Sequence, residues 1–155
     1  MTEKEYLEII RNNPDISVHN LNANEKVIGT YHPSQDKTTE HDEQVMLFRW
    51  AEQNLDRWDG VLAYMFSIPN GGQRHVAVAG KLKAEGVKPG VPDVFLPVSS
   101  GSYHGLFIEM KVGKNRPTDN QVRWIKRLRK LGHRAVVCYS ADEAIEIVKE
   151  YLGGE

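Results

Sequence analysis

Asp93, Glu109 and Lys111 are the residues of this chain whose types and spacing could support hydrolytic chemistry. Residues two apart on a β-strand point to the same face of a sheet, so Glu109 and Lys111 should project together and Met110 should point into the core. Asp93 begins the preceding predicted strand, and pairing of the two strands would bring its carboxylate beside Glu109. Two carboxylates and a backbone carbonyl offer the oxygen ligands that Mg²⁺ or Mn²⁺ prefers. A bound ion would polarise a phosphate and help to deprotonate water, while Lys111 would orient that water or stabilise charge on the phosphate.

The alternative is a charged pair at an exposed strand edge, where Glu and Lys two residues apart are common. The context favours the functional interpretation. The four residues before Glu109, Gly-Leu-Phe-Ile, are apolar enough for a central strand. Buried Glu and Lys are rare unless they are paired or have a role.

The elements that must position these residues follow from apolar spacing and from turn residues. Leu47, Phe48, Ala51 and Leu55 lie on one stripe of a helix predicted over residues 40–55. Residues 61–68, VLAYMFSI, have the length and composition of a buried strand. The remaining prediction is a helix over 75–85 ended by Gly86, strands over 93–98 and 105–112, a helix over 118–131, a strand over 135–139 and a helix over 142–152. This order predicts an α/β fold with a mixed four-stranded sheet flanked by helices.

The length of 155 residues fits one main domain, which we expect over residues 39–155, after an N-terminal extension over residues 1–38. The extension should hold a short helix at residues 3–11 and a polar loop. No apolar run is long enough to span a membrane, and the acidic N-terminus does not resemble a signal peptide. Cys138, the single cysteine, lies in an apolar run and should be a core residue. These features predict a cytoplasmic protein.

The net charge of −1 hides an asymmetry between two parts of the chain. Residues 1–60 carry twelve acidic residues and six Lys or Arg, whereas residues 61–155 carry nine acidic residues and fourteen Lys or Arg. The basic excess is densest between residues 111 and 134. Such a stretch can face the phosphates of a nucleic acid, or it can be an ordinary solvated helix face. The candidate nucleic-acid contacts in it are Lys114, Arg116 and Arg123.

The motifs around the acidic residues belong to a longer series. In chain order these are Pro69-Asn70-Gly71-Gly72-x-Arg74, Glu85-Gly86-Val87-Lys88-Pro89-Gly90-Val91-Pro92-Asp93, Ile108-Glu109-Met110-Lys111 and Gln121-x-x-Trp124. The Pro-Asp and Glu-x-Lys motifs resemble the PD-(D/E)xK nuclease signature. The whole series resembles the virus-type replication-repair nuclease (VRR-NUC) domain over roughly residues 40–152, which implies a restriction-endonuclease-like core.

This resemblance also implies a set of metal ligands. In that family the Asp and Glu of the motif bind a divalent metal together with the carbonyl of the residue between Glu and Lys, which implies Asp93, Glu109 and Met110. An acidic residue on the first helix lies near the metal, a few residues before a Gln. Glu40 and Glu43 both precede Gln44. We favour Glu40 because Glu40 and Gln44 extend the apolar stripe of the helix and should face inward.

Gln121 has two interpretations. It follows Thr118 by three residues, as the last residue of a capping box does, and would then reach back to the start of its helix. It also continues the inward stripe of that helix, and the resemblance favours a role in the active site. Trp124, one turn later, is better explained by packing than by base stacking.

A glycine-containing loop precedes the second predicted helix. This loop contains Asn70, Gly71, Gly72 and Arg74. Its two glycines would let backbone amides approach a phosphate closely, and Arg74 could clamp that phosphate. An ordinary turn between a strand and a helix explains the same residues equally well.

Together these observations predict a DNA endonuclease that depends on Mg²⁺ or Mn²⁺ and contacts the backbone rather than the bases. Small stand-alone members of the family, from phage and bacterial genomes, resemble Holliday-junction resolvases, which implies branched DNA, DNA repair and a homodimer with two active sites. One alternative is a non-catalytic DNA-binding or scaffolding module of the same fold. Another is a small-molecule hydrolase, which would need an enclosed apolar pocket.

Overall fold

The central layer of the protein is a four-stranded sheet, seen in a computed structural model that describes residues 38–69 and 76–153. Its strands lie side by side in the order β1 (Phe66–Ser67), β2 (Val94–Leu96), β3 (Leu106–Met110) and β4 (Arg134–Cys138). The β1–β2 and β2–β3 pairs are antiparallel, whereas β3 and β4 are parallel. The predicted mixed sheet is therefore confirmed.

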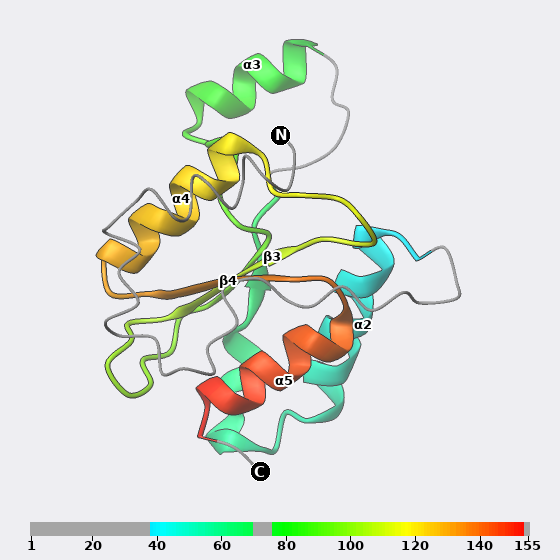
Figure 1. Ribbon diagram of the computed structural model, residues 1–155, viewed down its shortest axis with the longest axis vertical. Coiled ribbons are helices and arrows are strands. Elements are labelled where there is room, and N and C mark those ends of the chain that lie inside the picture. The colour runs from blue at the N-terminus through cyan, green and yellow to red at the C-terminus, as the bar shows by residue number, and fades with distance from the viewer. Residues whose placement is uncertain (1–37, 70–75, 154–155) are drawn as a thin grey trace.

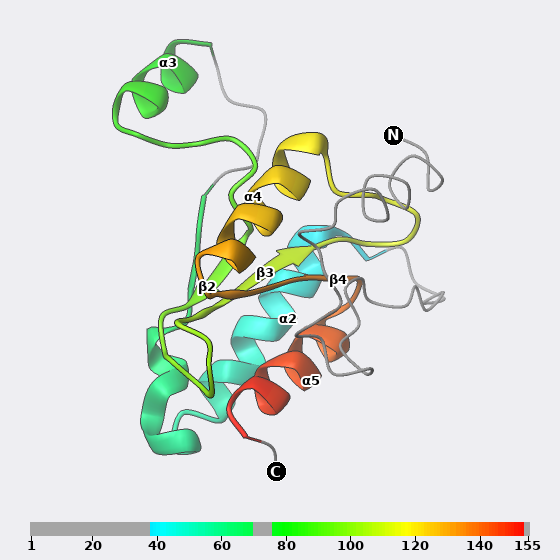
Figure 2. The same ribbon diagram turned by 60° about the vertical axis from the view of Figure 1, so that its left-hand side comes forward.

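Helices cover both faces of this sheet (Figures 1 and 2). Helices α2 (Glu40–Gln53) and α5 (Ala141–Tyr151) pack on one face, and α4 (Asp119–Lys130) packs on the other. Helix α3 (Val76–Ala84) stands away from the sheet, beyond the N-terminal end of α4. The predicted sandwich of helices around a sheet is confirmed.

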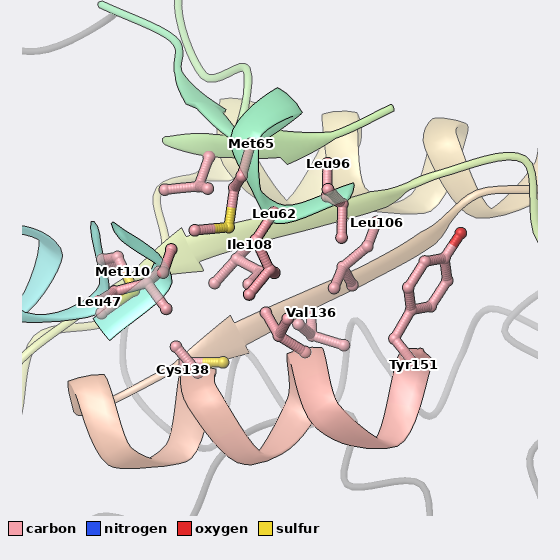
Figure 3. Close-up of a cluster of buried hydrophobic side chains, with 14 residues drawn as sticks. Leu47, Leu62, Met65, Leu96, Leu106, Ile108, Met110, Val136, Cys138 and Tyr151 are labelled. Atoms are coloured by element: carbon pink, nitrogen blue, oxygen red, sulfur yellow. The ribbon is translucent and has the colours of Figure 1, made fainter. Parts of the chain in front are cut away.

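Strand β3 divides the core, because its side chains alternate between the two faces. Leu106, Ile108 and Met110 point towards α2 and α5, where they join a cluster that includes Leu47 and Val136 (Figure 3). Phe107 points to the α4 face and packs with a second cluster. Every residue of β3 is buried, so the strand is central, as its apolar sequence predicted. The alternation places Glu109 on the α4 face.

The first helix is rotated relative to the prediction. It begins with a capping box, in which Thr39 and Asp42 exchange hydrogen bonds between side chain and backbone. Its buried residues are Glu43, Leu47 and Ala51. Glu40 and Gln44, which were expected to face inward, are half-buried, and Glu43 takes the fully inward position instead.

The strand predicted over residues 61–68 is also largely wrong. Residues Trp58–Tyr64 form a 3₁₀ helix, η2, and only Phe66–Ser67 pair with β2. Asp59 and Gly60 adopt positive φ angles of 56° and 76°, which bend the chain out of an extended path. The buried residues Leu62 and Met65 are three apart, a helical rather than an alternating spacing.

Other predictions have clear outcomes. Gly86 ends α3 with a φ of 96°, as expected for a left-handed helix terminus. Cys138 is fully buried, and burial raises the pKa of its thiol well above the ordinary value, which confirms a core residue. The helix predicted at residues 3–11 lies outside the described residues. Among those described, no helix has the length and apolar character needed to cross a membrane.

Candidate active site

The candidate site lies at the carboxyl end of β3, where the parallel pair β3–β4 ends. Glu109 is the penultimate residue of β3, and its side chain has an exposed fraction of 0%. Lys111 follows the strand, and its backbone N–H donates to the carbonyl of Cys138 at 2.8 Å. This bond extends the pairing with β4 by one residue, so the strand geometry still applies at Lys111. The Lys111 Nζ donates to Glu109 Oε1 at 2.6 Å, which shows that the two side chains project together.

Asp93 reaches the same place from the neighbouring strand. Val94 of β2 pairs with Ile108 of β3, so the antiparallel register sets Asp93 opposite Glu109. The Asp93 Oδ2 accepts a hydrogen bond from the backbone N–H of Met110 at 2.9 Å. Strand pairing therefore brings the Asp93 carboxyl beside that of Glu109, as the sequence predicted.

The Lys111 ammonium is surrounded by oxygens. Besides Glu109, its Nζ contacts the carbonyl of Met110 at 2.8 Å and Oε2 of Glu40 at 3.3 Å. It is largely buried, with a side-chain exposure of 8%. Burial, the largest single effect, lowers the pKa of Lys111, but the charge and hydrogen bond of Glu109 together with the charges of Glu40 and Asp93 raise the pKa above its ordinary value.

The two carboxyl groups have perturbed acidities. Burial, followed by repulsion from Asp93, raises the pKa of Glu109 from 4.5 to about 8. Burial also raises the pKa of Asp93, although the Met110 amide and Lys111 oppose the change. The pair consequently retains a proton near neutral pH, and this proton would have to leave before both carboxylates could hold a cation.

The donor set fits a hard divalent cation. Its atoms are carboxylate and carbonyl oxygens, the ligands of Mg²⁺ and Mn²⁺. Glu109 Oε2 is buried and has no hydrogen-bond partner among the described residues, so one oxygen of the fully buried carboxyl is left for a further ligand. In the described ranges no three His, Cys, Asp or Glu side chains are grouped closely enough to hold a metal. Asp93 and Glu109 would therefore act with the Met110 carbonyl and with water or substrate oxygens.

Gln121 serves both of the interpretations that the sequence left open. Its Oε1 accepts from the backbone N–H of Thr118 at 2.7 Å, which completes the capping box of α4. Its Nε2 donates to Glu109 Oε1. The side chain thus joins the start of α4 to the buried carboxyl. Trp124 packs against the α4-side cluster and donates to the Pro89 carbonyl at 3.1 Å, as expected for a packing residue.

The two acidic candidates on α2 have different partners. Glu40 reaches Lys111 and so lies at the site. Glu43 is buried, and its Oε2 accepts from the backbone N–H of Ala141 at 2.6 Å, which joins α2 to the start of α5. Glu40, rather than Glu43, therefore lies at the candidate site.

The basic stretch is divided between surface and structural roles. Lys114 and Arg123 are exposed, and Arg123 bonds to the side chain of Asn120. Other members are tied to the fold. Arg129 donates to the Ala135 carbonyl at 2.8 Å, and the buried Arg134 pairs with Glu150 at 3.1 Å. Only part of the predicted basic face is therefore available to a phosphate backbone.

Two residues near the site, Asn115 and Tyr139, were not predicted, whereas their neighbour Arg116 was predicted as a nucleic-acid contact. Arg116 donates to the hydroxyl of Tyr139 at 3.0 Å and lies over its ring. Asn115 donates to Oε1 of Glu40 at 3.0 Å. Asn115 is in a loop and Tyr139 follows a strand, so neither carries a periodic signal. The predicted phosphate loop, Asn70, Gly71, Gly72 and Arg74, lies outside the described residues.

The fold and the site together define the class of protein. The mixed four-stranded sheet flanked by helices is consistent with an α/β nuclease core. The family model described as the VRR-NUC domain matches residues 38–142. The chain is also similar to a solved structure described as "VRR_NUC domain protein", with 32% sequence identity, a TM-score of 0.64, and coverage of 76% of this chain and 92% of that chain. A comparison with curated proteins found no match.

This chain belongs to the VRR-NUC family, a nuclease-type family. The resemblance and the fold class inferred from the sequence motifs are thereby confirmed.

Proposed function

We propose that this protein is a divalent-metal-dependent DNA endonuclease whose active site is formed by Asp93, Glu109 and Lys111. The observation that carries the proposal is the convergence of these three side chains at the end of β3, with Lys111 Nζ 2.6 Å from Glu109 and Asp93 bonded to the Met110 amide. Burying the Glu109 carboxyl and the Lys111 ammonium beside the half-buried Asp93 is costly unless these groups are paired or functional. Family membership supports the nuclease assignment.

Asp93, Glu109 and the Met110 carbonyl would hold Mg²⁺ or Mn²⁺, which supplies a positive charge that polarises the scissile phosphate and acidifies bound water. Gln121 orients the Glu109 carboxyl through its Nε2. Lys111 contributes an ammonium that stays protonated, because its pKa is raised above the ordinary value. That ammonium would stabilise negative charge on the phosphate as the bond to the leaving group breaks.

The proposed substrate is a DNA backbone. Lys114 and Arg116 lie in the loop that directly follows the site residues, and Arg123 is one turn into α4. Their positive charges would contact phosphates on either side of the cleaved bond without reading bases. Branched DNA, including four-way junctions, and a homodimer that cuts two strands are the finer parts of this proposal.

The competing function is a DNA-binding or scaffolding module without catalysis. A module of this kind gives no reason for the Glu109 carboxyl, which is fully buried, lacks a hydrogen-bond partner at Oε2 within the part of the chain that the structure describes, and has a pKa raised to about 8. Perturbed acids of this kind concentrate at catalytic sites.

A panel of purified substrates tests the proposal. Single-stranded, duplex, flap and four-way DNA, with RNA counterparts, would be incubated with Mg²⁺, Mn²⁺ or EDTA. The wild-type protein should cleave at least one DNA only when the divalent ion is present, and Lys111→Ala should lose this activity. Lys149→Ala, a lysine on α5 that pairs with Glu146, is the matched control and should cleave like the wild type. Equal cleavage by wild type and Lys111→Ala would refute the assignment.

A further inference from the structure

Asn115 links the loop between β3 and α4, residues 112–117, to the first residue of α2. Its Nδ2 donates to Glu40 Oε1 at 3.0 Å, while the other carboxylate oxygen, Oε2, lies 3.3 Å from Lys111 Nζ. The start of α2 lies beside this loop in both views (Figures 1 and 2). The Glu40 carboxylate is therefore held by two residues that lie four apart along the chain.

Glu40 has few other constraints on its orientation. Its side chain is 40% exposed, and a Glu side chain at such a position loses conformational entropy when it is fixed. The capping box of Thr39 and Asp42 fixes the backbone at the start of α2 but does not include the Glu40 side chain. In the part of the chain that the structure describes, the hydrogen bonds to this carboxylate come from Lys111 and Asn115.

An amide suits this position chemically. An amide orients Glu40 by a hydrogen bond without adding a positive charge. The negative charge of Glu40 thus stays available to Lys111 and to a cation, whereas a lysine at position 115 would neutralise it.

We propose that Asn115 is a positioning residue that sets the orientation of Glu40 and, through Glu40, the placement of the Lys111 ammonium. The inference rests on the nuclease function proposed above. It assigns Asn115 no contact with DNA or with the reacting atoms. Its effect must therefore pass through Glu40, which separates it from a residue that only stabilises the loop.

A double-mutant cycle tests this dependence. Asn115→Ala, Glu40→Ala and the double variant would be compared with wild type in single-turnover cleavage of the DNA that the wild type cuts. Asn115→Ala should lower the rate at saturating DNA by about fivefold, the loss expected for one hydrogen bond to a charged group at a half-exposed site, with the DNA affinity unchanged. In the Glu40→Ala background the same substitution should have no further effect.

Binding of Mn²⁺ without DNA gives a second readout. Isothermal titration calorimetry should show weaker Mn²⁺ binding for Asn115→Ala, by about threefold, and no further weakening in the double variant. Gln53→Ala removes an exposed amide at the far end of α2 and is the matched control. It should match the wild type in both assays. Thermal melting of Asn115→Ala should stay close to that of wild type.

The outcomes separate this inference from the proposed function. Wild-type behaviour of Asn115→Ala, an undiminished effect in the Glu40→Ala background, or an equal loss in Gln53→Ala would each overturn the positioning role alone. Absence of metal-dependent cleavage by the wild-type chain would overturn the proposed function and this inference together.

Discussion

Replacing Glu109 by Gln should make the metal-free protein more stable at alkaline pH. In the folded chain, burial and the neighbouring Asp93 raise the pKa of Glu109 from 4.5 to about 8. Between these two values the folded state keeps a proton that the unfolded state has released. Unfolding is therefore favoured as the pH rises through this window, and the stability contributed by protonated Glu109 is present below pH 4.5 and lost as the pH approaches 8. A Gln side chain has the shape and the donor of the protonated acid and does not titrate.

The size of this stability change follows from the pH interval between the unfolded and folded pKa values of Glu109. One proton bound only by the folded state changes the free energy of unfolding by about 1.4 kcal/mol per pH unit. The difference in stability between Glu109→Gln and wild type should thus grow by about 3 kcal/mol from pH 5 to pH 7. Above pH 8 Glu109 is deprotonated in both the folded and the unfolded wild-type chain, so the difference in stability between Glu109→Gln and wild type should stop growing.

Urea denaturation in EDTA at half-unit steps from pH 5 to pH 9 measures this difference. Glu52→Gln, the same chemical change at an exposed position of α2, should track the wild type throughout. Saturating Mn²⁺ should remove the advantage of Glu109→Gln, because an ion bound by the folded state stabilises only the carboxylate form. A stability difference that does not vary with pH in EDTA would refute the reasoning.

Three further predictions concern residues around the site. Gln121→Glu keeps an acceptor for the capping box but replaces the amide that faces Glu109, so the cleavage rate should fall by about tenfold. Gln121→Ala should in addition lower the free energy of unfolding by about 1 kcal/mol in urea titrations. Cleavage at the wild-type rate by Gln121→Glu would contradict the role of this amide. Gly90 has a φ of 87°, and a Cβ there would lie 2.6 Å from Asn120 Cβ, so Gly90→Ala should destabilise the fold by about 2 kcal/mol. Gly113→Ala is the control: Gly113 has a φ of 54°, and apart from its chain neighbours no described residue has an atom within 4 Å of the added Cβ, so this substitution should lower stability less. Equal losses of stability would exclude the close approach to Asn120 as the cause. Lys114→Ala should weaken DNA binding in EDTA and make the fall of log affinity with log salt concentration less steep by about 0.9. An unchanged slope would show that Lys114 does not contact the DNA backbone.

Much of the fold could be predicted because the signals were local. The apolar residues before Glu109 indicated a central strand, and all of β3 is buried. The period of two on a strand then fixed which side of the sheet each motif residue occupies. Met110 lies in the core and Glu109 on the opposite face. A short antiparallel connection accounts for the approach of Asp93.

The incorrect predictions fall where composition and geometry disagree. The apolar composition of residues 61–68 indicated a strand, but most of this segment belongs to the 3₁₀ helix Trp58–Tyr64, which is kinked where Asp59 and Gly60 have positive φ angles. The rotation of α2 was misjudged because Glu43, a charged residue, takes a buried position where its carboxylate meets the Ala141 amide. A hydrophobic pattern cannot predict such a buried hydrogen bond.

The least predictable part of the site is the set of contacts made between distant segments. Asn115 meets Glu40 across 75 positions of the chain, and neither residue has a spacing that points to the other. The dual role of Gln121 was similarly hidden, since one side chain uses its oxygen for the cap and its nitrogen for Glu109. Only the packed arrangement of layers brings these groups together.

Single-turnover cleavage by Asp93→Asn and Glu109→Gln, measured beside their DNA affinity, tests the central claim most directly. If the two carboxyls and Lys111 form one hydrolytic centre, both variants should lose cleavage in Mg²⁺ by about a thousandfold or more. Their dissociation constants for the same DNA should stay within about threefold of wild type, because backbone contacts lie elsewhere. Cleavage at the wild-type rate by either variant would contradict the account.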